Sequence, residues 1–197
     1  MAAASKPAGG AELPALGDFE GLLAFYMAFH SDSVNQGIHL VFIPLIMWSA
    51  LVGMTAIPTP RALARVGGFP ALITAAYSAY YVKLNPALGL AWTGTLGAGV
   101  FAGACKYAAG AASGGGALKT AGYVRVSSWL AQFLGHGVFE RRAPSIFTGI
   151  AHSLLAAPFF VFVETAFALG FMPELHKRVK GRADQIRKAL DEAKKSK

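Results

Sequence analysis

Residues 37–57 read GIHLVFIPLIMWSALVGMTAI, and this stretch decides the fold class. No Asp, Glu, Lys or Arg occurs between Asp32 and Arg61. At ~1.5 Å per residue, a helix of this length crosses a hydrocarbon core of ~30 Å. The segment is therefore predicted to be a membrane-spanning helix.

Four more segments have the length and composition of membrane helices: 66–82, 87–104, 123–139 and 145–171. Short stretches that carry Lys or Arg separate them. Of the 197 residues, 54% are hydrophobic and 14% are charged, which is more apolar than a soluble domain of this size. We therefore predict an all-α fold, a polytopic integral membrane helical bundle in contact with the lipid bilayer. A soluble helical bundle is disfavoured.

The two ends of the chain differ from this middle part. Residues 1–16 are rich in Ala, Gly and Pro and are predicted to be a disordered tail, followed by a membrane-embedded domain over residues 17–175. Residues 176–197 are predicted to be a basic cytosolic tail. No base-reading or aromatic residues interleave with its charges, so nucleic acid is not expected as a partner. Lys194 and Lys195 stand four and three positions from the end, as in dilysine endoplasmic-reticulum retrieval signals.

Histidines are the candidate functional residues. The chain has five, namely His30, His39, His136, His152 and His176. The first four lie in or beside apolar segments, where an ionisable side chain is costly and therefore indicates function. Three or four neutral imidazoles suit iron, zinc, copper or nickel and do not select among these metals.

Turn residues separate His30 from His39. In one continuous helix, nine residues at ~100° each would place the two imidazoles on opposite faces. The sequence SDSVNQG at residues 31–37 favours a turn, so one helix is expected to end near His30 and the next to begin just before His39. The helix before His30 carries apolar residues at helical spacing, typical of an amphipathic helix on the membrane surface.

A polar stripe runs along the segment 123–139. Gln132, His136 and Glu140 recur every fourth residue and share one helix face. A polar stripe in an apolar helix must face protein or water. Without the other histidines, a buried hydrogen-bonded network would be the simpler interpretation. His152 lies about two turns into the next segment and can face the same site.

Two separated motifs, in this order, resemble a known family. The residues that carry the resemblance are Phe25-Tyr26, His30, Asn35, Ile38-His39 and Pro44, then Trp129, Gln132-Phe133, Gly135-His136-Gly137, Phe139-Glu140, Arg142 and Pro144, then Ala157-Pro158, Glu164 and Gly170-Phe171-Met172-Pro173. In this order they are similar to the 2-hydroxy-fatty-acid dioxygenase family of fungal phytosphingosine breakdown, over about residues 18–175. The segment 57–120 matches that family only in hydropathy.

This resemblance implies an iron(II)-dependent enzyme of the endoplasmic-reticulum membrane. Such an enzyme uses O2 to shorten a 2-hydroxy fatty acid by one carbon, with release of CO2, in α-oxidation. The resemblance places His30, His39 and His136 in the catalytic metal site, which makes residues 17–175 the catalytic domain. His152 is not part of the family pattern, but helical geometry admits it as a fourth metal ligand.

Polar neighbours of the histidines are expected to support the site. Asn35, Gln132 and Glu140 can orient the imidazoles, because ligating histidines usually donate their second N–H to such groups. Arg141 or Arg142 can attract the substrate carboxylate. The alternative for this arginine pair is a topology marker under the positive-inside rule.

The ligands can meet only in some topologies. His39 begins the first predicted span and His136 nearly ends the fourth, so four crossings return them to one side. A fifth crossing by 145–171 would place the basic tail opposite the N-terminus. A re-entrant helical hairpin that turns at Pro158 avoids this, and a single tilted spanning helix with a proline kink is the alternative.

Two other functions compete with the dioxygenase. A diiron membrane hydroxylase or desaturase needs several HxxH or HxxxH clusters, and the sequence contains none. A non-catalytic membrane lipid-binding or scaffold protein explains the apolar segments but gives no reason for convergent histidines.

Overall fold

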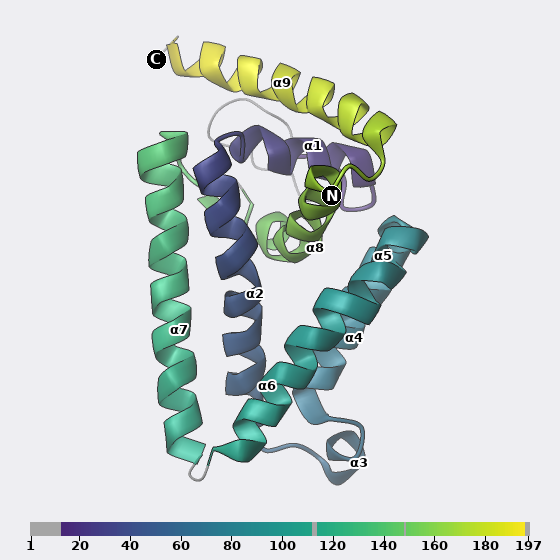
Figure 1. The fold of residues 1–197 in the computed structure, drawn as a ribbon, viewed down its shortest axis with the longest axis vertical. Helices are drawn as coiled ribbons and strands as arrows, with labels where there is room; N and C mark the ends of the chain where they lie inside the picture. The colour runs from purple at the N-terminus through teal and green to yellow at the C-terminus, as the bar shows by residue number, and fades with distance from the viewer. Residues whose placement is uncertain (1–12, 112–113, 148, 196–197) are drawn as a thin grey trace, which may run out of the picture. The chain divides into compact units, whose positions relative to one another are not determined.

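All regular structure is helical in the residues that the computed structural model describes, 13–111, 114–147 and 149–195. The predicted all-α fold class is therefore confirmed. The elements, shown in Figure 1, are α1 (Phe19–Phe29), α2 (Ser33–Thr55), α3 (Arg61–Ala64), α4 (Gly68–Leu84), α5 (Pro86–Trp92), η1 (Thr93–Gly97), α6 (Ala98–Gly110), α7 (Gly114–Leu134), η2 (Gly135–Glu140), η3 (Ser145–Phe147), α8 (Ile150–Ala168) and α9 (Pro173–Lys195).

The chain divides into two compact units. One unit is Met1–Gly37 together with Leu134–Lys197, and the other is Ile38–Phe133. Of the expected disordered tail, residues 1–12 lie outside the described residues. The expected boundary at 175/176 falls inside α9, which belongs to the first unit.

The unit Ile38–Phe133 has a core formed by α2, α6 and α7. Its buried side chains are Leu51, Val52, Ala104, Ala117 and Ala121. Residues 51–52 lie near the end of α2, whereas residues 117 and 121 lie near the start of α7, so the two helices are antiparallel (Figure 1). The start of α2 and the end of α7 therefore lie at the same end of this unit. Of the four spans predicted up to residue 139, the segments 66–82 and 123–139 are not among the candidate membrane spans of the described helices.

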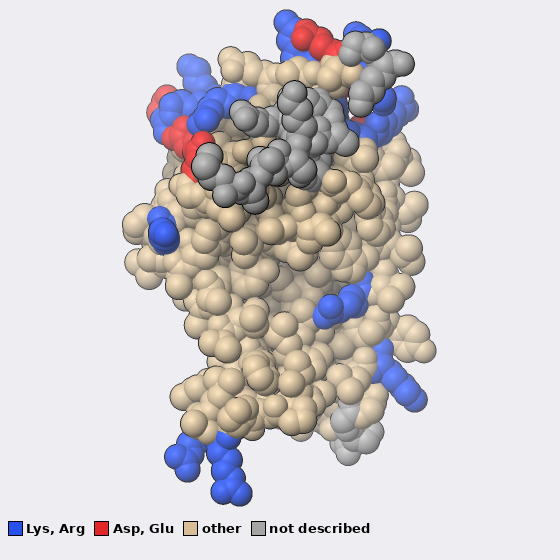
Figure 2. All heavy atoms as spheres, turned by 180° about the vertical axis from the view of Figure 1, so that it is seen from behind, with Lys and Arg blue, Asp and Glu red and all other residues tan. Residues whose placement is uncertain are grey.

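Three of the described helices are long and apolar enough to cross a membrane. They are Ser33–Thr55, the continuous helix Pro86–Gly110 formed by α5, η1 and α6, and Ile150–Ala168. Figure 2 shows Lys, Arg, Asp and Glu side chains gathered at the top of the view, and below them a mainly uncharged face with a few separate Lys and Arg side chains. Large apolar side chains are exposed on α2, α4, α5 and α7, as expected for a surface in contact with lipid; they include Leu40, Val41, Leu72, Leu90, Tyr123, Val126 and Leu130.

The first unit is built around α1. Asp18 caps this helix by accepting a hydrogen bond from the Gly21 N–H at 2.9 Å. Eight of the eleven residues of α1 are buried, because α8 covers one side and α9 covers another. The sequence predicted an amphipathic helix on the membrane surface, and α1 is instead a core helix of this unit.

Helix α8 continues through Pro158 as one helix of 19 residues. The re-entrant hairpin expected at this proline is therefore not observed. An interior proline removes a single backbone donor, which a helix that is packed along its length can tolerate.

Contacts along α8 keep it beside the segment that contains α1. Near the start of α8, the His152 Nε2–H donates to the Pro14 carbonyl oxygen at 3.0 Å. In the middle, the ring of Phe160 lies 6.2 Å from that of Phe19. Beyond the end, Arg178 of α9 forms an ion pair with Glu20 at 2.8 Å. Helix α8 is long enough to cross a membrane, and its middle packs against α1.

Helix α9 returns to the residues that precede α8. Arg187 pairs with Glu140 at 3.0 Å, and Asp191 pairs with Arg142. The buried face of α9, formed by Val179, Ala183 and Leu190, packs in the same unit. These contacts hold the segments before and after α8 within the same unit.

Candidate metal centre

Three histidines come together in a buried cluster. Among the described residues, His30, His39 and His136 each offer a ring nitrogen, and these atoms lie within 4.8 Å of one another. Each of the three side chains is 3% exposed. They come from the end of α1, the second turn of α2 and the segment η2. The cluster is therefore assembled from parts of the chain that are far apart in sequence.

The end of α1 fixes the orientation of His30. The His30 backbone N–H donates to the Met27 carbonyl oxygen and ends the helix. The ring Nδ1 lies 2.7 Å from the Tyr26 carbonyl oxygen, which can only accept, so Nδ1 carries the proton. The Tyr26 ring stacks on the imidazole with centroids 4.0 Å apart. The lone pair of His30 is consequently on Nε2, the nitrogen that faces away from the helix end.

The turn between α1 and α2 is shorter than the sequence predicted. Helix α2 begins at Ser33, because Asp32 caps it by accepting hydrogen bonds from the N–H groups of Val34 at 2.8 Å and Asn35 at 3.2 Å. His39 therefore lies in the second turn of α2 rather than at its start.

Glu140 holds this turn to the segment that carries His136. Its carboxylate accepts hydrogen bonds from the Ser31 N–H and Oγ–H, at 3.1 and 2.6 Å, and from the Asp32 N–H at 2.9 Å. Asn35 Nδ2 lies 3.4 Å from the same carboxylate. Glu140 thereby fixes the position of His30 relative to His136.

The Glu140 carboxylate is fully buried, with a side-chain exposure of 0%, and Arg187 provides the compensating charge. Burial alone would raise the pKa of this carboxyl group. The hydrogen bonds from Ser31 and Asp32 and the charge of Arg187 outweigh burial, so the pKa of Glu140 lies below its ordinary value. The group is an anion at neutral pH.

His136 lies in a π-helical segment, not in the regular α-helix that the sequence predicted. In η2, the Arg141 N–H donates to the His136 carbonyl oxygen, five residues back, and Arg141 has a left-handed φ of 51°. Glycines at positions 135 and 137 weaken the preference for a regular α-helix here. The His136 ring meets the His30 ring edge to face, with centroids 4.9 Å apart.

The other predicted site residues lie in different surroundings. His152 is not in the cluster and donates to Pro14. Gln132 is buried, 5% exposed, as expected of the polar stripe. Arg141 is exposed at the end of η2, whereas Arg142 forms its ion pair with Asp191. His176 stacks on Phe167 with centroids 4.6 Å apart.

Two polar side chains of this region were given no role from the sequence. Glu164 of α8 has a buried Oε1, and Tyr26 of α1 has a buried hydroxyl. Glu164 is the only acidic residue between Ser145 and Phe171. An ionisable residue in such an apolar segment indicates function by itself, so this signal was present in the sequence.

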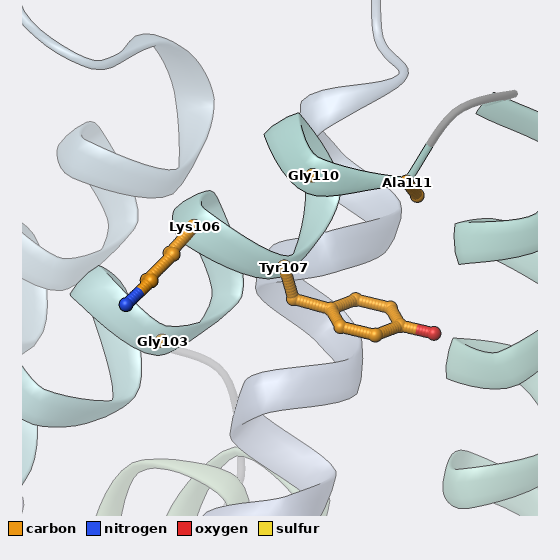
Figure 3. A pocket seen from close by; sticks show the side chains of 5 residues that line it. All are labelled: Gly103, Lys106, Tyr107, Gly110 and Ala111. Atoms are coloured by element: carbon orange, nitrogen blue, oxygen red, sulfur yellow. The ribbon is translucent and has the colours of Figure 1, made fainter.

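A pocket of ≈ 490 Å³ lies on α6 in the other unit (Figure 3). None of the clustered histidines lines it. Tyr107 points into this pocket and packs on Trp48, with ring centroids 5.0 Å apart. The pocket is therefore not the candidate site. Its lining residues are Gly103, Lys106, Tyr107, Gly110 and Ala111.

The fold and the cluster define an all-helical protein with candidate membrane spans and a buried site of three histidines that could hold a metal ion. The family described as "2-hydroxy-palmitic acid dioxygenase Mpo1-like" matches residues 16–169. The chain therefore belongs to this family, which confirms the family that the two motifs indicated.

A curated relative covers most of the chain. The chain is 30% identical over 158 residues to the Saccharomyces cerevisiae protein named 2-hydroxy-palmitic acid dioxygenase MPO1, with 80% of this chain and 85% of the yeast protein aligned. No solved structure matches the chain.

Proposed function

We propose that this chain is an iron(II)-dependent dioxygenase that shortens 2-hydroxy fatty acids by one carbon. The proposed setting is the endoplasmic-reticulum membrane, with several crossings, in the α-oxidation of fatty acids released from lipid and sphingoid-base breakdown. The observation that carries the proposal is the buried cluster of three histidines in a member of a dioxygenase family.

The overall reaction balances with O2 as the only other reactant. The C1–C2 bond of the 2-hydroxy acid breaks, C1 leaves as CO2, and C2 becomes the new carboxyl carbon. The substrate loses four electrons in these changes, and O2 takes them up to yield one new carboxyl oxygen and one water molecule. Neither oxoglutarate nor a flavin is then required as an electron donor.

The histidine cluster fits a divalent transition metal. Two nitrogen ligands of one ion, each at about 2.1 Å, lie about 3.0 to 3.4 Å apart. Ring nitrogens that already lie within 4.8 Å of one another reach this spacing by small side-chain rotations. Three neutral imidazoles leave coordination positions open. When bound, iron(II) would bind the hydroxy acid through its two oxygens and make O2 reactive.

Residues around the cluster would prepare it for this chemistry. The Tyr26 carbonyl oxygen holds His30 in the tautomer that presents Nε2. Glu140 holds the turn that carries His30. Arg142 already pairs with Asp191, so we assign Arg141 the larger part in attracting the substrate carboxylate. The acyl chain would lie among the apolar helices. His152 is left out of the proposed ligand set because it bonds to Pro14.

Metal analysis and O2 uptake test the proposal. The purified protein, reconstituted with iron(II), is supplied with 2-hydroxypalmitic acid. We expect about one iron per chain and equal amounts of O2 consumed, CO2 released and pentadecanoic acid formed. Palmitic acid without the 2-hydroxyl group serves as the control substrate and should give no CO2.

The competing function makes a different prediction in the same experiment. A membrane scaffold or lipid-binding protein would bind fatty acids with no stoichiometric metal and no O2 uptake. That result in freshly purified, iron-treated protein would refute the dioxygenase proposal.

A further inference from the structure

Two buried polar groups stand beside the metal cluster without a hydrogen-bond partner among the described residues. They are the hydroxyl of Tyr26 and Oε1 of Glu164. A buried polar group that is left unbonded lowers stability, so such a group in a native site calls for an explanation.

The two groups lie close to each other and to the cluster. Phe160, one helical turn before Glu164, contacts the Tyr26 ring with centroids 5.7 Å apart. Glu164 also lies close enough to Tyr26 for an electrostatic interaction between the two side chains. The Tyr26 ring also stacks on His30. The phenol and the carboxyl group therefore lie at the edge of the metal site.

The chemistry of the pair indicates what it can bind. In the described part of the chain neither the Tyr26 hydroxyl nor Glu164 Oε1 has a hydrogen-bond partner, so both are available to a ligand. The phenol offers a donor, and Oε1 of the Glu164 carboxyl group offers an acceptor. A hydroxyl group is the ligand that uses both at once, since its oxygen accepts while its proton is donated. A carboxylate would offer acceptors only, which would leave the Oε1 acceptor of Glu164 unbonded.

We propose that Tyr26 and Glu164 recognise the 2-hydroxyl group of the substrate and position C2 at the metal cluster. This inference rests on the proposed function and extends it to substrate selection. Both residues act as positioning residues that contact the substrate, and neither is a metal ligand. A site built to bond a hydroxyl group rejects an analogue that lacks it, because the buried partners are then left unbonded.

Displacement binding under anaerobic conditions tests the proposal without turnover. Iron(II)-loaded protein in detergent binds radiolabelled 2-hydroxypalmitate, which is displaced by unlabelled 2-hydroxypalmitate or by palmitate. The ratio of the two half-displacement concentrations measures the preference for the hydroxyl group. Both acids have the same acyl chain, so their partition into detergent affects this ratio little.

Two conservative variants remove one partner each. Tyr26→Phe keeps the ring that stacks on His30, and Glu164→Gln keeps the shape of the side chain. We expect each variant to lower the preference for 2-hydroxypalmitate by about tenfold, because a lost hydrogen bond costs roughly this factor. Palmitate binding and iron content should not change. Tyr123→Phe, at a 76% exposed position, and Glu192→Gln, on the exposed face of α9, are the matched controls.

Three other results would each overturn the inference, and each has a different cause. An unchanged preference in both variants would show that Tyr26 and Glu164 bond a structural water or each other. Loss of iron in Glu164→Gln would make that residue a metal ligand. If the wild-type protein binds no iron, the proposed function itself fails, and this failure is visible before any variant is made.

Discussion

Replacement of Glu140 by Gln is the sharpest test of how the metal centre is held together. Glu140 carries no predicted chemistry of its own, yet it accepts hydrogen bonds from Ser31, Asp32 and Arg187. Glutamine has the same shape but turns one acceptor oxygen into an NH2 donor. Whichever way the amide faces, at least one buried N–H or O–H loses its acceptor.

The size of the effect follows from these contacts. One buried donor left unsatisfied costs about 1–3 kcal/mol, and the remaining bonds lose the strength that a charged acceptor gives them. The total is about 2–4 kcal/mol, a large part of the ~5–15 kcal/mol that stabilises a typical protein. At ~2–4 °C per kcal/mol, the melting temperature should fall by about 4–16 °C.

Thermal unfolding of metal-free protein in detergent measures this fall, and the Glu192→Gln variant is its control because Glu192 is exposed on α9. Iron retention is measured in parallel, since the turn that carries His30 should loosen. The reasoning fails if Glu140→Gln melts within about 1 °C of the control and retains iron like wild type.

The same carboxylate predicts a pH dependence. The pKa of Glu140 is lower in the folded chain than the ordinary value of 4.5. Its contribution to stability is therefore complete above pH 4.5 and is lost as the pH falls through the lower folded value. The stability difference between wild type and Glu140→Gln should shrink over that acidic range. A difference that stays constant down to the point of acid unfolding would contradict this.

Further predictions concern the histidines and the topology. His30→Ala, His39→Ala and His136→Ala should each abolish iron retention and turnover. His176→Ala removes only a ring stacked on Phe167 and should affect neither. Full activity in one of the first three variants would remove that residue from the ligand set. His152→Gln should keep iron and part of the activity because His152 bonds to Pro14, and complete iron loss would instead show a four-histidine site. A protease added to sealed microsomes should cleave tags at both chain ends, because the ion pairs of α9 with Glu20 and Glu140 favour one face of the membrane for both ends. Protection of only one tag would mean that α8 crosses the membrane.

The sequence predicted the helical fold and singled out the histidines that come together, because both depend on local signals. Long apolar runs are readable one segment at a time. The turn residues after His30 predicted a helix break, and the break lies there, although Asp32 starts the next helix earlier than expected. The family could be recognised because each of its two motifs lies within a short stretch of the sequence.

Long-range contacts were not predictable in the same way. The arginines and lysines of α9 look alike in sequence, and nothing local indicates that Arg187 reaches Glu140, 47 residues away. For the same reason, the apolar pattern of α1 predicted one buried face but not the second, which α9 covers. The predicted hairpin at Pro158 treated the proline as a turn, whereas α8 continues through it as one helix.

Because η2 is π-helical, the number of residues between His136 and Glu140 decides where the Glu140 carboxylate points, in addition to the identity of these residues. An α-helix would cover the same path with one residue fewer. Deletion of one residue between these two positions would restore the α-helical spacing and change the angle between the His136 and Glu140 side chains around the helix axis. A related chain could then keep every residue of the motif and still direct Glu140 away from Ser31. For this family, an alignment gap inside the motif is as informative as a substitution.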